Sequence, residues 1–102
     1  MKDSKNKVNL KYIPFDVLEE VAKLFQENAE KHKEKGYDFE WKKAEPDEYE
    51  QALLRHISSY IQGEKVDPDS SRLTALHILA NSMIVCYHEL ERVKNEQRKR
   101  KN

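Results

Sequence analysis

The chain has 102 residues, which is enough for one domain, and its 19 basic and 19 acidic side chains cancel at neutral pH. This balance argues against a protein that binds nucleic acid or an anionic membrane through a general positive field. Only 37% of the residues are hydrophobic, so one copy would bury a thin core, for which oligomerisation is a common remedy.

The single cysteine, Cys86, lies in an apolar run, so a disulfide framework is excluded and a reducing compartment is favoured. No apolar run is long enough to cross a bilayer, and the polar start MKDSKNK does not resemble a signal peptide. We therefore expect a cytoplasmic protein with no membrane partner.

The chain begins with a charged segment without periodicity, so residues 1–11 are predicted to form a flexible arm. A single helical domain is predicted over residues 12–93, and its first helix runs from about Pro14 to Lys35. The apolar stripe of this helix is expected to comprise Leu18, Val21, Ala22, Phe25 and Ala29.

A linker over residues 36–45 carries three aromatic residues, among them Trp41, which are costly to leave in water. We expect this linker to fold back onto the helices or onto a partner. A second helix is predicted from about Pro46 to Gln62, because proline suits a first helical turn and Gly63 suits a helix end. Its predicted apolar stripe comprises Tyr49, Ala52, Leu53, Ile57, Tyr60 and Ile61.

The third helix is predicted from about Ser71 to at least Val93, and residues 94–102 form a charged tail. A seam at spacings of three and four is formed by Leu73, Leu76, Ala80, Met83, Tyr87 and Leu90. Further apolar residues lie off this seam, so the helix should be buried on most sides, one of them against another subunit. The sequence thus predicts an all-α protein, a small bundle of about three main helices completed by oligomerisation.

Two groups of polar residues interrupt the second and third helices. Arg55 and His56 lie in mid-helix, and the apolar neighbours of His56 at three and four residues predict that it faces inward. On the third helix, Thr74, His77 and Asn81 share one face. Each group could bind a ligand, or it could be structural. His56 would then be a hydrogen-bonded core histidine, and the polar face of the third helix would form interhelical hydrogen bonds that fix the oligomeric state.

Carboxylates form two further groups. Glu64, Asp67 and Asp69 lie within six residues and could bind a hard divalent cation, or they could form a solvated turn that caps the third helix. On the first helix, Glu20, Glu27 and Lys31 share one face at spacings of seven and four. This face could contribute to a functional site, or it could be an exposed charged face with ion pairs between successive turns. Taken together, carboxylates, arginine and histidine suit a divalent cation and a polyphosphate.

The order of these motifs resembles the dATP/dGTP diphosphohydrolase N-terminal domain family, which includes MazZ-type phage enzymes and belongs with the MazG-like all-α nucleotide pyrophosphohydrolases. The resemblance spans about residues 12–90 and rests on the segments PFDVLEEVAKLF, AEKH, EWKK, ALLRHISSYIQGEKVDPDSS and LHILAN. It implies a hydrolase that depends on Mg²⁺, which Mn²⁺ can replace, and that cleaves a (deoxy)nucleoside triphosphate between phosphates. Purine deoxynucleotides in phage nucleotide metabolism are the implied substrates. The apolar sides of the third helix lead us to expect self-association, as a homodimer or homotetramer.

The resemblance also implies roles for individual residues. The implied catalytic residues are Arg55, His56 and Lys31. The implied metal ligands are Glu20 (or its neighbour Glu19), Glu64, Asp67 and Asp69, and the implied substrate contacts are Trp41, His77 and Asn81. Among the departures from the family pattern, Ser71 replaces a glycine and Thr74 replaces the first of two histidines.

Two other functions stay open on the sequence alone. One is a non-catalytic helical oligomerisation or interaction module derived from the same fold. The other is nucleic-acid binding through the basic tail at residues 94–102. The neutral net charge of the chain argues against such binding.

Overall fold

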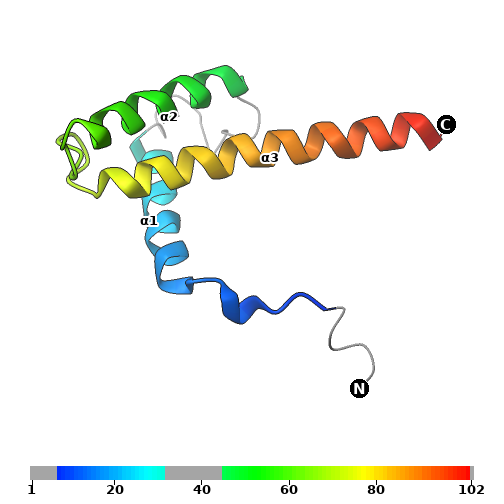
Figure 1. Cartoon of the computed structure of the whole chain (residues 1–102), viewed down its shortest axis with the longest axis horizontal. Coiled ribbons are helices and arrows are strands. Elements are labelled where there is room, and N and C mark those ends of the chain that lie inside the picture. Colours follow the sequence, from blue (N-terminus) through cyan, green and yellow to red (C-terminus); the bar gives the residue numbers. More distant parts are fainter. Residues whose placement is uncertain (1–6, 32–44, 102) are drawn as a thin grey trace.

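The computed structural model describes residues 7–31 and 45–101. These residues form a short 3₁₀ helix, η2 (Leu10–Tyr12), and three α-helices, α1 (Phe15–Lys31), α2 (Pro46–Ile61) and α3 (Thr74–Lys101) (Figure 1). The described ranges contain no strand, only one antiparallel bridge between Val66 and Leu73. The prediction of a small all-α bundle with three main helices is confirmed, whereas the linker with Trp41 lies outside the described residues.

The helices are arranged as an antiparallel pair crossed by a third helix. α2 packs along the first half of α3, while α1 lies across α3 at a steep angle (Figure 1). The second half of α3 projects beyond α2 toward the C-terminus. In the described part of the chain, no helix combines the length and apolar character needed to cross a bilayer.

The core is small and lies where α1 crosses α3. Its buried side chains are Val21 and Leu24 of α1 together with Ala80 and Ile84 of α3. Phe25, Leu76 and Leu79 pack against this cluster from its edges. Ala80 is 5% exposed, so this small side chain is enclosed at the crossing of the two helices.

The predicted stripes of α1 and α2 are partly wrong. On α1, Leu24 is buried although the predicted stripe omitted it, and Ala22 is exposed although the stripe included it. On α2, Ile61 is 76% exposed because it is the last residue of the helix and extends past the core. The ring of Tyr60 is covered by Lys65, whose Nζ lies 3.4 Å from the ring centroid.

The predicted seam of α3 is also shifted. Ile84, predicted to lie off the seam, is 4% exposed, whereas Met83 and Leu90 of the seam are exposed. The face of α3 that meets α1 and α2 is set by the crossing of α1, which the spacing of residues within α3 does not encode. Within one chain α3 is therefore not buried on most sides.

The ends of α3 differ from the predicted ends. The helix begins at Thr74, and Ser71, the predicted start, adopts a left-handed conformation with φ of +63° that cannot belong to a right-handed helix. At the other end α3 continues through residues 94–101, the segment predicted as a charged tail. Ion pairs of Arg92 with Glu89 and Glu96 support this extension.

The loop that joins α2 to α3 is closed by hydrogen bonds. Gly63, with φ of +100°, takes the chain out of α2, a conformation that glycine tolerates best. The N–H of Thr74 donates to the carbonyl of Lys65 (2.9 Å), and its fully buried hydroxyl donates to the carbonyl of Glu64 (2.8 Å). These bonds fix where α3 starts relative to the end of α2.

Candidate functional site

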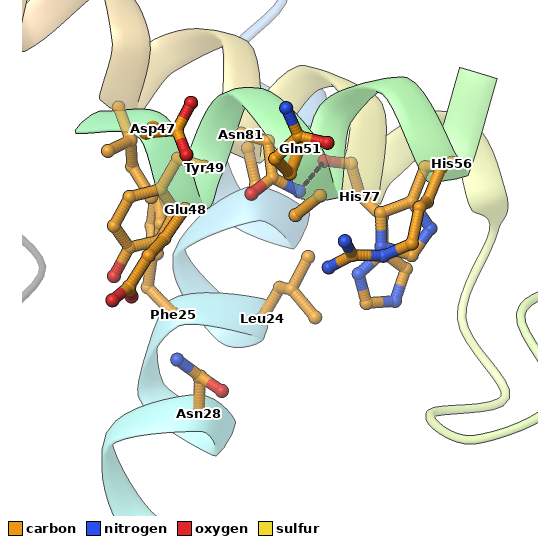
Figure 2. Close-up of a pocket in the computed structure, with 14 residues that line it drawn as sticks. Leu24, Phe25, Asn28, Asp47, Glu48, Tyr49, Gln51, His56, His77 and Asn81 are labelled. Atoms are coloured by element: carbon orange, nitrogen blue, oxygen red, sulfur yellow. Dashed lines mark hydrogen bonds between the residues drawn. The ribbon is translucent and has the colours of Figure 1, made fainter. Parts of the chain in front are cut away.

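A cavity of about 690 Å³ lies between α2 and α3, and α1 forms its third wall (Figure 2). Four of the site residues predicted from the sequence line it, namely Arg55 and His56 from α2 and His77 and Asn81 from α3. Leu24 and Ala80 contribute apolar surface from the core. The structure thus brings the two mid-helix polar groups together in one concave site, with the size and mixed polarity of small-molecule sites.

The two histidines at one end of the cavity stack on each other. The ring centroids of His56 and His77 are 4.6 Å apart and the ring planes are inclined by 17°. This pairing arises because α2 and α3 are antiparallel neighbours, so that residues on facing turns meet (Figure 2). His56 therefore faces inward, as its apolar neighbours predicted.

Two loop residues also contact His77. Its Nε2 lies 2.7 Å from the hydroxyl of Ser70 and 3.7 Å from the carboxylate of Asp67. Burial and the positive charge of a protonated His56 lower the pKa of His77, and they outweigh the opposing effect of Asp67. We therefore treat His77 as a neutral imidazole at pH 7, in polar contact with Asp67 rather than in a full ion pair.

Asp67 has a structural task in the loop. Its carboxylate accepts a hydrogen bond from the N–H of Ser70 (2.9 Å), and its backbone N–H donates to the carbonyl of Arg72 (2.8 Å). Burial raises the pKa of this carboxyl, but the hydrogen bonds from Ser70 and the neighbouring histidines lower it by more. The Asp67 carboxylate is thus fixed inside its own turn.

Asn81 is held by its own helix. Its side-chain amide nitrogen donates to the carbonyl of His77, one turn earlier, at 2.8 Å (Figure 2). This bond satisfies part of the amide, which in an apolar segment would otherwise cost about 1–3 kcal/mol. The amide therefore keeps a fixed position in the cavity wall.

Glu20, predicted as a metal ligand, lies outside this cavity and is neutralised by basic side chains. It accepts hydrogen bonds from Lys23 (2.9 Å) and Arg72 (3.3 Å), and the bond to Lys23 is the largest cause of its lowered pKa. Arg72 also forms a two-pronged contact with Glu27, with Nε 2.7 Å from one carboxylate oxygen. Sequence reasoning missed Arg72, one of two basic residues, with Lys65, in the loop that joins the second and third helices.

Three other predicted site residues do not line the cavity, and Trp41 lies outside the described residues. Glu64 and Asp69 are exposed in the loop, and Lys31 is exposed at the end of α1. Over residues 7–31 and 45–101, no three His, Cys, Asp or Glu side chains lie close enough together to hold a metal ion. The described residues of one chain therefore do not fit a carboxylate cage for Mg²⁺.

Several cavity residues were not predicted. They come mostly from the first turns of α2 and comprise Asn28, Asp47, Glu48, Tyr49 and Gln51. The signal for Asp47 and Gln51 was their spacing from Arg55 at intervals of four, which places all three on one face of α2.

Comparison with known proteins identifies the family. The sequence model of the dATP/dGTP diphosphohydrolase, N-terminal family matches residues 1–98. The chain belongs to this family. No curated protein and no solved structure matches the chain. The match confirms the family that the sequence motifs indicated, and it covers nearly the whole sequence.

The lowered pKa of His77 predicts a pH-dependent stability. The unfolded chain takes up a proton near the ordinary histidine pKa of about 6.5, whereas folded His77 resists protonation. The free energy of unfolding should therefore fall as the pH drops below about 7 and level off below the folded pKa. Urea unfolding between about pH 8 and pH 5 should show this slope, and His77→Gln should reduce it.

His88→Gln provides the matched control, because it makes the same change further along α3, outside the cavity. This variant should keep the slope of the unaltered protein. If His77→Gln left the pH dependence of the free energy of unfolding unchanged, the lowered pKa of His77 would not be its cause.

Proposed function

We propose that this chain binds a purine deoxynucleoside triphosphate in the cavity between α2 and α3 and hydrolyses it between two phosphates. The supporting observation is that Arg55, His56, His77 and Asn81 line one cavity in a chain of the dATP/dGTP diphosphohydrolase, N-terminal family. The proposed substrate pool is cytoplasmic, and the motif resemblance points to phage nucleotide metabolism.

The side chains at the histidine end suit phosphate chemistry. The guanidinium of Arg55 is permanently charged and can donate two parallel hydrogen bonds to a phosphate. It would stabilise the negative charge that builds up as the bond between phosphates breaks. The imidazole of His56 lies beside it, and we propose that this side chain accepts a proton from the attacking water. Lys31 at the end of α1 would add positive charge only on movement toward the cavity, since it does not line it.

We propose that Mg²⁺, or Mn²⁺ in its place, enters as the counter-ion of the triphosphate itself. This route follows from the absence of a carboxylate cage among the described residues. Exposed Glu64 is the loop carboxylate that we propose to contact the incoming cation complex, because Asp67 is already engaged in its own turn.

The proposed activity predicts turnover of at least one nucleotide from a panel of dNTPs and NTPs with Mg²⁺ or Mn²⁺. Arg55→Gln should lower kcat/KM on the order of a hundredfold, because a phosphate donor is lost. Release of pyrophosphate or phosphate is the measurement. Arg98→Gln, the same change in the extended end of α3, should keep full activity.

The same assay tests the cation contact. Glu64→Gln should raise the Mg²⁺ concentration needed for half-maximal rate, whereas Glu50→Gln, an equal change on α2 outside the cavity, should not. No turnover of any nucleotide by the pure protein would refute the proposed activity.

A second candidate function, a helical interaction module, is favoured by the exposed apolar surface of α3. Met83, Leu90 and Val93 are 38%, 61% and 40% exposed, and their spacing places them along one side of the helix. We propose that a second copy of the chain covers this side, in a homodimer or homotetramer. This assembly is compatible with either function, and only the nucleotide assay separates them.

Self-association predicts a mass of at least a dimer in sedimentation velocity. Leu90→Glu should shift the protein toward the monomer, because a carboxylate would have to be buried in the interface. Ile61→Glu, at a still more exposed apolar residue on α2, should leave the mass unchanged. A monomer at all concentrations before any substitution would rule out the proposed assembly.

A further inference from the structure

The two ends of the cavity differ in charge and character. Arg55 and the stacked pair His56 and His77 lie at one end. Tyr49 and Glu48, from the first turns of α2, lie at the other, and Figure 2 shows the Glu48 side chain running beside the Tyr49 ring. Between these ends the wall is uncharged and is formed by alanine, amide and larger apolar side chains, among them Leu24 and Ile84.

The distance between the ends suits an elongated ligand. Tyr49 and His56 are seven residues apart on one helix, which corresponds to about 10 Å along its axis. Facing them, Ile84 and His77 of α3 are separated by the same interval in the opposite direction. The cavity is therefore a trough along two antiparallel helices, with α1 as its floor (Figure 2).

Electrostatics favour one orientation of a nucleotide in this trough over the reverse one. A phosphate gains attraction from the guanidinium of Arg55 and hydrogen bonds from the imidazoles, whereas the carboxylates of Asp47 and Glu48 would repel it. The aromatic end offers the opposite chemistry, because a half-buried tyrosine ring can stack on a base and a carboxylate accepts hydrogen bonds from base N–H groups.

Tyr49 is suited to this role in its neutral form. Burial, and then the negative charge of Glu48, raise the pKa of its phenol above the ordinary value. The ring therefore stays uncharged at neutral pH and keeps a hydroxyl group that can donate to the ligand.

Resting on the proposed function, we propose that the cavity binds a nucleotide with its phosphates at Arg55, His56 and His77 and its base at Tyr49 and Glu48. The base that fits is guanine, because its adjacent N1–H and N2–H donors can both reach one carboxylate. Adenine presents an acceptor at N1, which the Glu48 carboxylate would repel. Glu48 is thus assigned as a specificity-determining residue and Tyr49 as the stacking residue.

Binding of three probes separates the two ends, with affinities measured by isothermal titration calorimetry. The probes are dGMP, deoxyguanosine and inorganic pyrophosphate, none of which contains a nucleoside-linked phosphoanhydride bond to be cleaved. Arg55→Gln should weaken dGMP and pyrophosphate about tenfold or more and leave deoxyguanosine unchanged. Tyr49→Ala should weaken dGMP and deoxyguanosine about tenfold and leave pyrophosphate unchanged.

Two further comparisons sharpen the assignment. Tyr60→Ala removes a tyrosine of the same helix outside the cavity, and should change no affinity. Glu48→Gln should weaken dGMP about tenfold and dAMP by much less. Circular dichroism of each variant establishes that the helices are retained.

Three outcomes would overturn the proposal. Arg55→Gln could weaken deoxyguanosine while Tyr49→Ala weakens pyrophosphate, each variant could weaken all three probes equally, or no probe could bind at millimolar concentration. The outcome is separable from that of the proposed function. Hydrolysis of dGTP unaffected by Tyr49→Ala would refute the orientation but not the activity. The expected binding pattern without hydrolysis would refute the activity but not the orientation.

Discussion

The site depends on the hydrogen bonds that close the loop between α2 and α3. The buried hydroxyl of Thr74 donates to Glu64, and its N–H donates to Lys65, so the start of α3 is tied to the end of α2. A donor left unpaired in such a buried place costs about 1–3 kcal/mol, which makes alternative registers unfavourable. This register lays His77 against His56 and opens the cavity beside them.

Ser71 in this loop and Thr74 at its end are two of the departures from the family pattern that the motif resemblance implies, and the structure gives each a physical meaning. Ser71 stands where the family has glycine and adopts a φ of +63°, a conformation that costs a non-glycine residue about 1–2 kcal/mol. Its N–H donates to the carbonyl of Asp67 at 2.8 Å, which helps to hold the strained turn. Thr74 stands where the family has a histidine, and it stabilises the loop instead of adding a third imidazole to the site.

The sequence predicted local features better than the meeting of distant ones. The helices could be predicted because Pro46 and Gly63 mark ends that backbone geometry requires, and inward-facing His56 followed from its neighbours. The pairing of Arg72 with Glu27, 45 residues apart, depends on how α1 crosses α3. That crossing also packs Ala80 against Val21 and Leu24, and it gives the cavity its third wall, so these features could not be read from spacing within one helix.

Occupation of the cavity between α2 and α3 by a nucleotide can be followed in the NMR spectrum of the histidine side chains during titration with dGMP. A nucleotide bound there should shift the ring resonances of His56 and His77 together, and should leave those of His88, outside the cavity on α3, unchanged. Saturating dGMP that leaves His56 and His77 unchanged, or shifts His88 instead, would contradict nucleotide binding in this cavity.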